Sequence, residues 1–124
     1  MEALNIMVVD DSHISVKKLS KVVEELGHNV VQVARTGKEA VEEYDRVNPD
    51  LVTMDITMPD MNGIEATRQI RSKYKDALIL MVTSHGQEQM VMDAIEAGAK
   101  GYILKPFEKN KLAEAIEKMI DRFG

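Results

Sequence analysis

Five short apolar segments are spaced along the chain, at residues 5–9, 29–33, 50–54, 77–82 and 101–104. The first and the fourth are apolar at nearly every position, as in parallel strands that are covered on both faces. Between the segments, apolar residues recur at intervals of three and four, which is the spacing of one helical face. The pattern therefore predicts strands that alternate with helices, each helix turning its apolar face inward.

Two of the expected helices show this spacing clearly. Their inward-facing residues are Val16, Leu19, Val23 and Leu26 in the first helix, and Leu112, Ile116, Met119, Ile120 and Phe123 in the last. Gly27 and Gly98 follow the first and fourth helices, where a left-handed residue is usual. The segment TGKE at residues 36–39 forms a capping box that opens the second helix.

Strand and helix alternate five times with short connections, which predicts a single (βα)5 domain over residues 1–124. Right-handed crossovers place helices on both faces of a parallel sheet. The predicted fold class is therefore α/β, with a doubly wound five-stranded parallel sheet. In open sheets of this kind, binding sites form beyond the carboxyl ends of the strands.

Composition narrows the classes of function. Lys and Arg number 16 against 21 Asp and Glu, giving a net charge of −5, which argues against nucleic-acid binding because phosphate contacts need a basic surface. The absence of cysteine excludes disulfides and thiolate metal sites and fits a reducing cytosol. No apolar stretch approaches the roughly 20 residues of a membrane span. We therefore expect a cytoplasmic protein with neither nucleic-acid nor membrane partners.

The residues at the expected strand ends carry the candidate chemistry. They are Asp10 and Asp11 after the first strand, Asp55 after the third, Thr83 and Ser84 at the fourth, and Lys105 after the fifth. Clustered carboxylates repel one another unless a cation lies between them. Mg²⁺ prefers oxygen ligands, and it is typically bound by one or two carboxylates together with phosphate oxygens. The cluster thus indicates Mg²⁺ and phosphate chemistry, in which an Asp can be the nucleophile and a lysine and a hydroxyl can contact phosphoryl oxygens.

Each of these residues alone has a simpler structural explanation. Asp11 and Ser12 are good helix N-caps, Asp55 is a turn former, and Tyr102 is an ordinary half-buried aromatic residue. We interpret His85 as an exposed loop residue rather than a ligand. The functional hypothesis rests on the gathering of three acids, a hydroxyl and a lysine at one edge of the sheet.

Four segments resemble the receiver domains of two-component response regulators, in particular their single-domain, CheY-like members. These segments are VVDDS at 8–12, VTMDITMPDMNG at 52–63, MVTS at 81–84 and GYILKPF at 101–107. The resemblance extends over essentially the whole chain. It implies a flavodoxin-like fold with strand order 2-1-3-4-5, an order that is taken from the family rather than worked out from the residues.

The resemblance also implies a role for each matching position. Asp55 matches the phosphoacceptor. The Mg²⁺ site is matched by Asp10, Asp11, Asp55 and the backbone carbonyl of Thr57. Thr83 matches the switch hydroxyl, Lys105 matches the family's lysine, and Tyr102 matches the aromatic switch. A cis peptide bond between Lys105 and Pro106 is implied as well.

The implied function is that of a two-component response regulator. Such a protein accepts a phosphoryl group from a sensor histidine kinase and changes a protein-docking surface, here in chemotaxis or flagellar motor control. It is not a conventional enzyme, although it catalyses its own phosphorylation and dephosphorylation. The expected partners are the kinase, a downstream target such as a flagellar motor switch protein, and a phosphatase.

Three other functions remain open. A phosphorelay intermediate would use the same residues. A Mg²⁺-dependent phosphatase with an aspartyl-phosphate intermediate would share the acids and the lysine, but the short connections leave little chain for a cap over its substrate. A flavodoxin-like cofactor module is disfavoured because the acidic segment DDSHIS follows the first strand, where a bound phosphate needs glycine and backbone donors.

Overall fold

The computed structural model describes residues 2–124, in which five strands alternate with five helices. In chain order the elements are β1 (Asn5–Val9), α1 (His13–Glu25), β2 (Asn29–Ala34), α2 (Gly37–Val47), β3 (Leu51–Met54), α3 (Gly63–Lys73), β4 (Ile79–Thr83), α4 (Glu88–Ala97), β5 (Gly101–Leu104) and α5 (Lys109–Phe123). The strands form one sheet in the order β2-β1-β3-β4-β5, and every pairing is parallel. The predicted fold class and the strand order implied by the resemblance are both confirmed.

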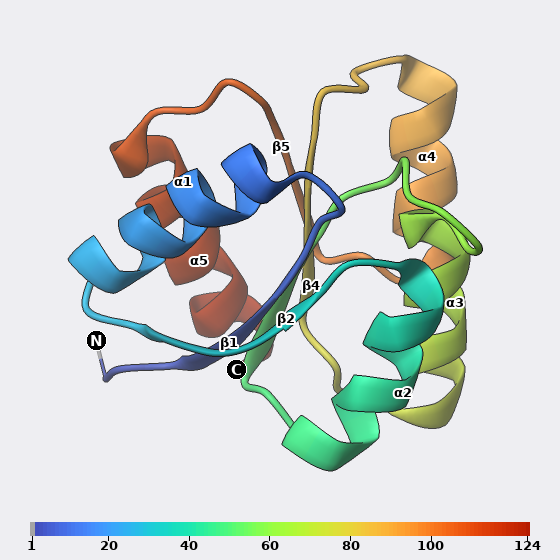
Figure 1. The fold of residues 1–124 in the computed structure, drawn as a ribbon, viewed down its shortest axis with the longest axis horizontal. Coiled ribbons are helices and arrows are strands. Elements are labelled where there is room, and N and C mark those ends of the chain that lie inside the picture. Colours follow the sequence, from blue (N-terminus) through green and yellow to red (C-terminus); the bar gives the residue numbers. More distant parts are fainter. Residues whose placement is uncertain (1) are drawn as a thin grey trace.

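The sheet lies between two layers of helices, with α1 and α5 on one face and α2, α3 and α4 on the other (Figure 1). Successive side chains of a strand point to opposite faces. In β1, accordingly, Ile6 and Val8 belong to the apolar cluster of α1 and α5, whereas Met7 and Val9 belong to the cluster on the other face. All residues of β3 and β4 are buried, as their unbroken apolar character predicts.

Helix ends follow the predicted turn chemistry. The Thr36 side chain accepts a hydrogen bond from the backbone N–H of Glu39 at 3.0 Å, so the N-cap half of the predicted capping box of α2 is present. Asn48 ends the same helix in the left-handed conformation, with φ of 48°, and Gly98 ends α4 with φ of 113°. Thr36 thus marks the start of α2, and the left-handed residues mark the ends of α2 and α4 before the next strands.

Two sequence-based expectations need correction. β4 begins at Ile79, two residues later than predicted, because Ala77 and Leu78 are buried before the strand rather than within it. Phe123 was expected on the inward face of α5, but its side chain is 46% exposed and its ring lies against the Lys100 ammonium, 4.7 Å from the ring centroid. The last turn of α5 therefore packs under a lysine at the start of β5, where a cation–π contact takes the place of burial.

The strand order reverses at β1, since β2 lies on one side of it and β3 on the other. Ligand sites of doubly wound sheets form at such a point, outside the carboxyl ends of the strands. Within residues 2–124, no helix combines the length and the apolar character needed to cross a bilayer.

Candidate functional site

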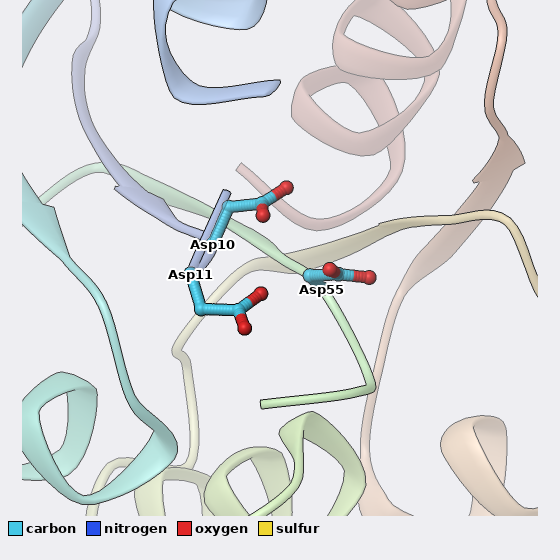
Figure 2. A group of neighbouring side chains, drawn as sticks. All are labelled: Asp10, Asp11 and Asp55. Carbon is cyan, nitrogen blue, oxygen red and sulfur yellow. The ribbon is translucent and has the colours of Figure 1, made fainter. Parts of the chain in front are cut away.

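Three carboxylates meet at the reversal point of the sheet. The last residues of β1 and β3, Val9 and Met54, are partners in the sheet register, and the N–H of Asp55 donates to the carbonyl of Val9 at 3.0 Å. Asp10 and Asp11 follow β1 directly, so all three acids leave neighbouring strand ends. Their carboxylate oxygens lie within 4.8 Å of one another, and Figure 2 shows the side chains projecting from the two strand ends.

The three acids differ in burial. Asp10 is only 1% exposed and Asp55 is 9% exposed, whereas Asp11 faces solvent. Backbone donors fix the two buried side chains: Asp10 Oδ1 accepts from the N–H of Ser12 at 2.9 Å, and Asp55 Oδ1 accepts from the N–H of Ile56 at 2.8 Å. Each buried carboxylate thus keeps one oxygen, Oδ2, for other partners.

Lys105 occupies the space beside these Oδ2 atoms. Its Nζ lies 2.6 Å from Asp10 Oδ2 and 3.6 Å from Asp55 Oδ2. The ammonium also donates to the hydroxyl of Ser15 on the first turn of α1, at 3.2 Å. The lysine reaches this position from the end of β5, past a cis Lys105–Pro106 peptide bond.

The environment disfavours the charged form of Asp55. Burial is the largest cause that raises the pKa of this carboxyl above its ordinary value, and the negative charge of Asp10 raises it further. The ammonium of Lys105 and hydrogen bonds from Ile56 and Thr83 act in the opposite direction. A nearby cation therefore favours the ionised form of Asp55, and a perturbed carboxyl group of this kind marks a candidate functional site.

Thr83 and Tyr102 lie beside the acids, on the two strands that follow β3 in the sheet. The hydroxyl of Thr83 is fully buried and accepts a hydrogen bond from the N–H of His85 at 3.3 Å. The Tyr102 hydroxyl donates to the carbonyl of His85 at 2.5 Å. Burial and then the charge of Asp55 raise the pKa of Tyr102, so its hydroxyl keeps its proton and remains a donor.

The predicted site residues occupy one edge of the sheet, but two contacts there were not anticipated. Ser15 binds the lysine, and its only signal in the sequence is a hydroxyl on the helix turn that follows the acids. His85 was interpreted as an exposed loop residue, yet it is half-buried and its Nε2 shares a hydrogen bond with Thr57 Oγ1 at 2.7 Å. Nothing in the residue pattern predicts the second contact, because it depends on the paths of two loops.

The donor set suits a hard divalent cation. Three carboxylates within 4.8 Å offer only oxygen ligands, which is what Mg²⁺ requires. Asp11 is exposed, so the cluster is open to solvent on one side. The residues present therefore fit Mg²⁺, and a neighbouring lysine already supplies part of the positive charge that the acids need.

Comparisons with known proteins agree with this geometry. The sequence model of the response regulator receiver domain matches residues 6–117. The chemotaxis protein CheY of Listeria monocytogenes is 44% identical over 115 residues, covering 93% of this chain and 97% of its own. The CheY of Thermotoga maritima is 42% identical over 114 residues, covering 92% and 95%. A chain in the crystal structure of the CheX–CheY–BeF3–Mg²⁺ complex from Borrelia burgdorferi is 36% identical, with a TM-score of 0.91 over 96% of this chain and 90% of that one.

Proposed function

Because the chain belongs to the response regulator receiver domain family, we propose that residues 1–124 form a phosphorylation-dependent switch of a two-component system that acts in chemotaxis. Asp55 accepts the phosphoryl group of a histidine kinase, and the response is a changed docking surface for a target protein. The observation that carries the proposal is the placement of Lys105 beside two buried carboxylates and one exposed carboxylate at the reversal point of the sheet. The proposed site of action is the cytoplasm, which fits a sequence without cysteine.

Asp55 is the proposed nucleophile. Its Oδ1 is already bonded to the N–H of Ile56, which leaves Oδ2 to attack phosphorus. A bond forms between this oxygen and phosphorus while the bond from phosphorus to the kinase histidine breaks, and the imidazole keeps the electron pair. Asp10, Asp11, Asp55 and the backbone carbonyl of Thr57 would hold Mg²⁺, which when bound neutralises charge on the phosphoryl oxygens.

Lys105 and Thr83 respond to the transferred group. Phosphorylation adds about −1.5 to −2 units of charge, and Lys105 lies 3.6 Å from the accepting carboxylate. The buried hydroxyl of Thr83 acts to lower the pKa of Asp55, as a hydrogen-bond donor to that carboxylate would. Both groups are expected to turn toward the phosphoryl oxygens, which gives the phosphorylated protein a preferred conformation.

The proposed docking surface consists of α4, β5 and α5. Met92, Ile95 and Leu104 are each about half exposed on α4 and β5, and a groove of about 630 Å³ runs along β5 and α5. Tyr102 lines this groove and bonds to the β4–α4 loop. A shift of that loop on phosphorylation would therefore move Tyr102 and alter the surface. A flagellar motor switch protein is the proposed target.

The nucleophile can be tested with acetyl phosphate, a small phosphodonor. The wild-type protein with Mg²⁺ is expected to show a retarded band on a phosphate-affinity gel, and Asp55→Asn is expected to show none. Asp121→Asn, an exposed acid on α5, is the matched control and should be modified like the wild type. Equal modification of Asp55→Asn would show that another residue accepts the phosphoryl group.

The pathway can be tested by affinity capture from the source cell with and without beryllofluoride, a phosphoryl mimic. Retention of a flagellar motor switch protein only in the presence of beryllofluoride supports the chemotaxis proposal. Onward transfer of phosphate from Asp55 to a histidine of a captured protein would instead identify a phosphorelay intermediate.

A further inference from the structure

His85 is hydrogen-bonded to three different segments of the chain. Its Nε2 and the Oγ1 of Thr57 are 2.7 Å apart, its backbone N–H donates to Thr83 Oγ1 at 3.3 Å, and its carbonyl accepts from the Tyr102 hydroxyl at 2.5 Å. Thr57 follows Asp55 by two residues, whereas Tyr102 belongs to β5. One residue of the β4–α4 loop thus contacts both the loop after the phosphoacceptor and the aromatic residue of the docking surface.

The side-chain bond to Thr57 is the contact that ties the two loops together. Among residues 2–124, no other side-chain hydrogen bond links residues 84–87, which join β4 to α4, with residues 55–62, which join β3 to α3. The β4–α4 segment is otherwise mostly exposed and contains Gly86, whose backbone is intrinsically permissive. The imidazole is therefore one of two contacts, with the N–H bond to Thr83, that anchor the His85 backbone on the side away from Tyr102.

From this geometry we infer that His85 is a positioning residue that couples the Asp55 loop to Tyr102. By binding Thr57, the imidazole of His85 holds the backbone carbonyl of the same residue where the Tyr102 hydroxyl can reach it. The inference rests on the proposed function, because it identifies His85 as the link between the proposed phosphorylation site and the proposed docking surface.

The size of the expected effect follows from one hydrogen bond. The net contribution of one typical hydrogen bond changes the ratio of two conformations by about fivefold. That is small against the stability of a whole domain, but it is enough to alter a balanced equilibrium between a loop-bound and a free Tyr102. The appropriate readout is therefore the population of Tyr102 conformations and not the unfolding of the protein.

The test uses ¹⁹F NMR of the full chain labelled with 3-fluorotyrosine, with the Tyr102 resonance assigned from Tyr102→Phe. In the unactivated protein, His85→Ala is expected to lower the ratio of loop-bound to free Tyr102 by about fivefold. His85→Gln, whose amide can reach Thr57, should recover part of the ratio. Gln87→Ala is the matched control in the same loop, because Gln87 makes no side-chain capping bond, and it should leave the ratio unchanged.

A double-mutant cycle separates the side-chain bond from general loosening of the loop. Thr57→Val is expected to lower the ratio in the wild-type background and to have no further effect in His85→Ala. Additive effects of the two substitutions, or a wild-type ratio in His85→Ala, would overturn the inference.

Addition of Mg²⁺ and beryllofluoride then distinguishes this inference from the proposed function, because the bound fluorides report occupancy of Asp55 in the same spectrum. Full occupancy with a reduced Tyr102 response in His85→Ala supports the coupling, and full occupancy with a wild-type response contradicts it. If the wild-type protein does not bind beryllofluoride, the proposed function fails, and the fivefold change in the unactivated protein still decides the role of His85.

Discussion

The Nζ atom of Lys105 lies 2.6 Å from Oδ2 of Asp10, and this ion pair joins the end of β5 to the end of β1. Asp10 is almost wholly buried, so the pair is shielded from solvent and depends on its geometry. The lysine thereby occupies the side of the acid cluster that faces Asp55. A divalent cation and this ammonium would therefore compete for the carboxylate of Asp10.

Lys105→Met is therefore expected to strengthen Mg²⁺ binding while it slows phosphorylation of Asp55. The repulsion between a unit charge and a divalent ion at ion-pair distance, about 4 Å, is ~2 kcal/mol in a water-like dielectric, so its removal would lower the Kd for Mg²⁺ by about thirtyfold. Calorimetric titration with Mg²⁺ measures the first effect, and the rate of modification by acetyl phosphate measures the second. Lys75→Met, which removes an exposed lysine before β4, should change neither. Weaker Mg²⁺ binding in Lys105→Met would contradict competition between the two cations.

Asp55→Asn is expected to stabilise the metal-free protein at neutral pH. The pKa of Asp55 is raised in the folded state, so the folded protein holds this proton more tightly than the unfolded chain. Stability is therefore lost as the pH rises from the ordinary value of 3.8 through the raised pKa. The gain in Asp55→Asn should be complete above the folded pKa and should vanish toward pH 3.8. Urea unfolding in a chelator checks it, with Asp121→Asn as the comparison, and a gain that persists at acid pH would refute the assignment.

His28 is expected to make the protein less stable below neutral pH. This residue is 8% exposed, and its Nδ1 accepts a hydrogen bond from the N–H of Leu4 at 3.0 Å, which requires an unprotonated nitrogen. Burial lowers the pKa of His28 below 6.5. The unfolded chain therefore takes up this proton first, and stability is lost as the pH falls from 6.5 to the lowered pKa.

The unfolding free energy measured between pH 7 and pH 5 should accordingly fall less in His28→Gln than in the wild type. His13→Gln, at an exposed position on α1, should keep the wild-type slope. An unchanged slope in His28→Gln would mean that other groups account for the pH dependence.

Gly63→Ala is expected to damage both the fold and the site. A Cβ atom at this position would overlap the backbone carbonyl of Asp55, and the N–H of Gly63 closes the loop by donating to Ile56 at 2.8 Å. Backbone cannot yield as a flexible side chain does, so the substitution should cost about 3 kcal/mol and displace the carboxylate of Asp55. Denaturant unfolding and acetyl phosphate labelling measure the two effects.

Gly86→Ala provides the matched comparison. Its Cβ would meet only the end of the Leu104 side chain, at 3.0 Å, and that side chain is half exposed and able to move. The change should stay within about 0.5 kcal/mol. Equal losses in the two variants would show that the close approach at Gly63 has no special importance.

The strands and their covering helices could be predicted because burial on both faces leaves a plain mark on the sequence. β1 and β5 begin and end where predicted, and a charged residue, Asp10 or Lys105, follows each of them. β4 does not, because Ala77 and Leu78 are buried just before the strand and so resemble strand residues. Phe123 could not be placed, because it continues the helical periodicity of α5 although it is 46% exposed. The strand order came from the family resemblance alone.

The acid cluster could be predicted for a simple reason: parallel strands end at the same edge, so residues that follow them are neighbours. Contacts made by long or mobile groups could not. Whether Lys105 bonds to Ser15, and whether His85 reaches Thr57, depends on side-chain rotamers and loop paths that leave no periodic signal. The sequence therefore indicated which chemistry gathers at the edge, and the structure adds how its parts are tied together.

The shared apolar cluster of α1 and α5 has a consequence for synthesis of the protein. Val16, Leu19 and Val23 emerge early from the ribosome, but the residues that cover them with the sheet include Leu112 and Ile116 of the final helix. The apolar surface of α1 therefore stays partly exposed through most of translation, and exposed apolar surface of this kind promotes aggregation or chaperone binding. The apolar cluster of α2, α3 and α4 contains no residue of α5, so all of its residues are synthesised before that helix.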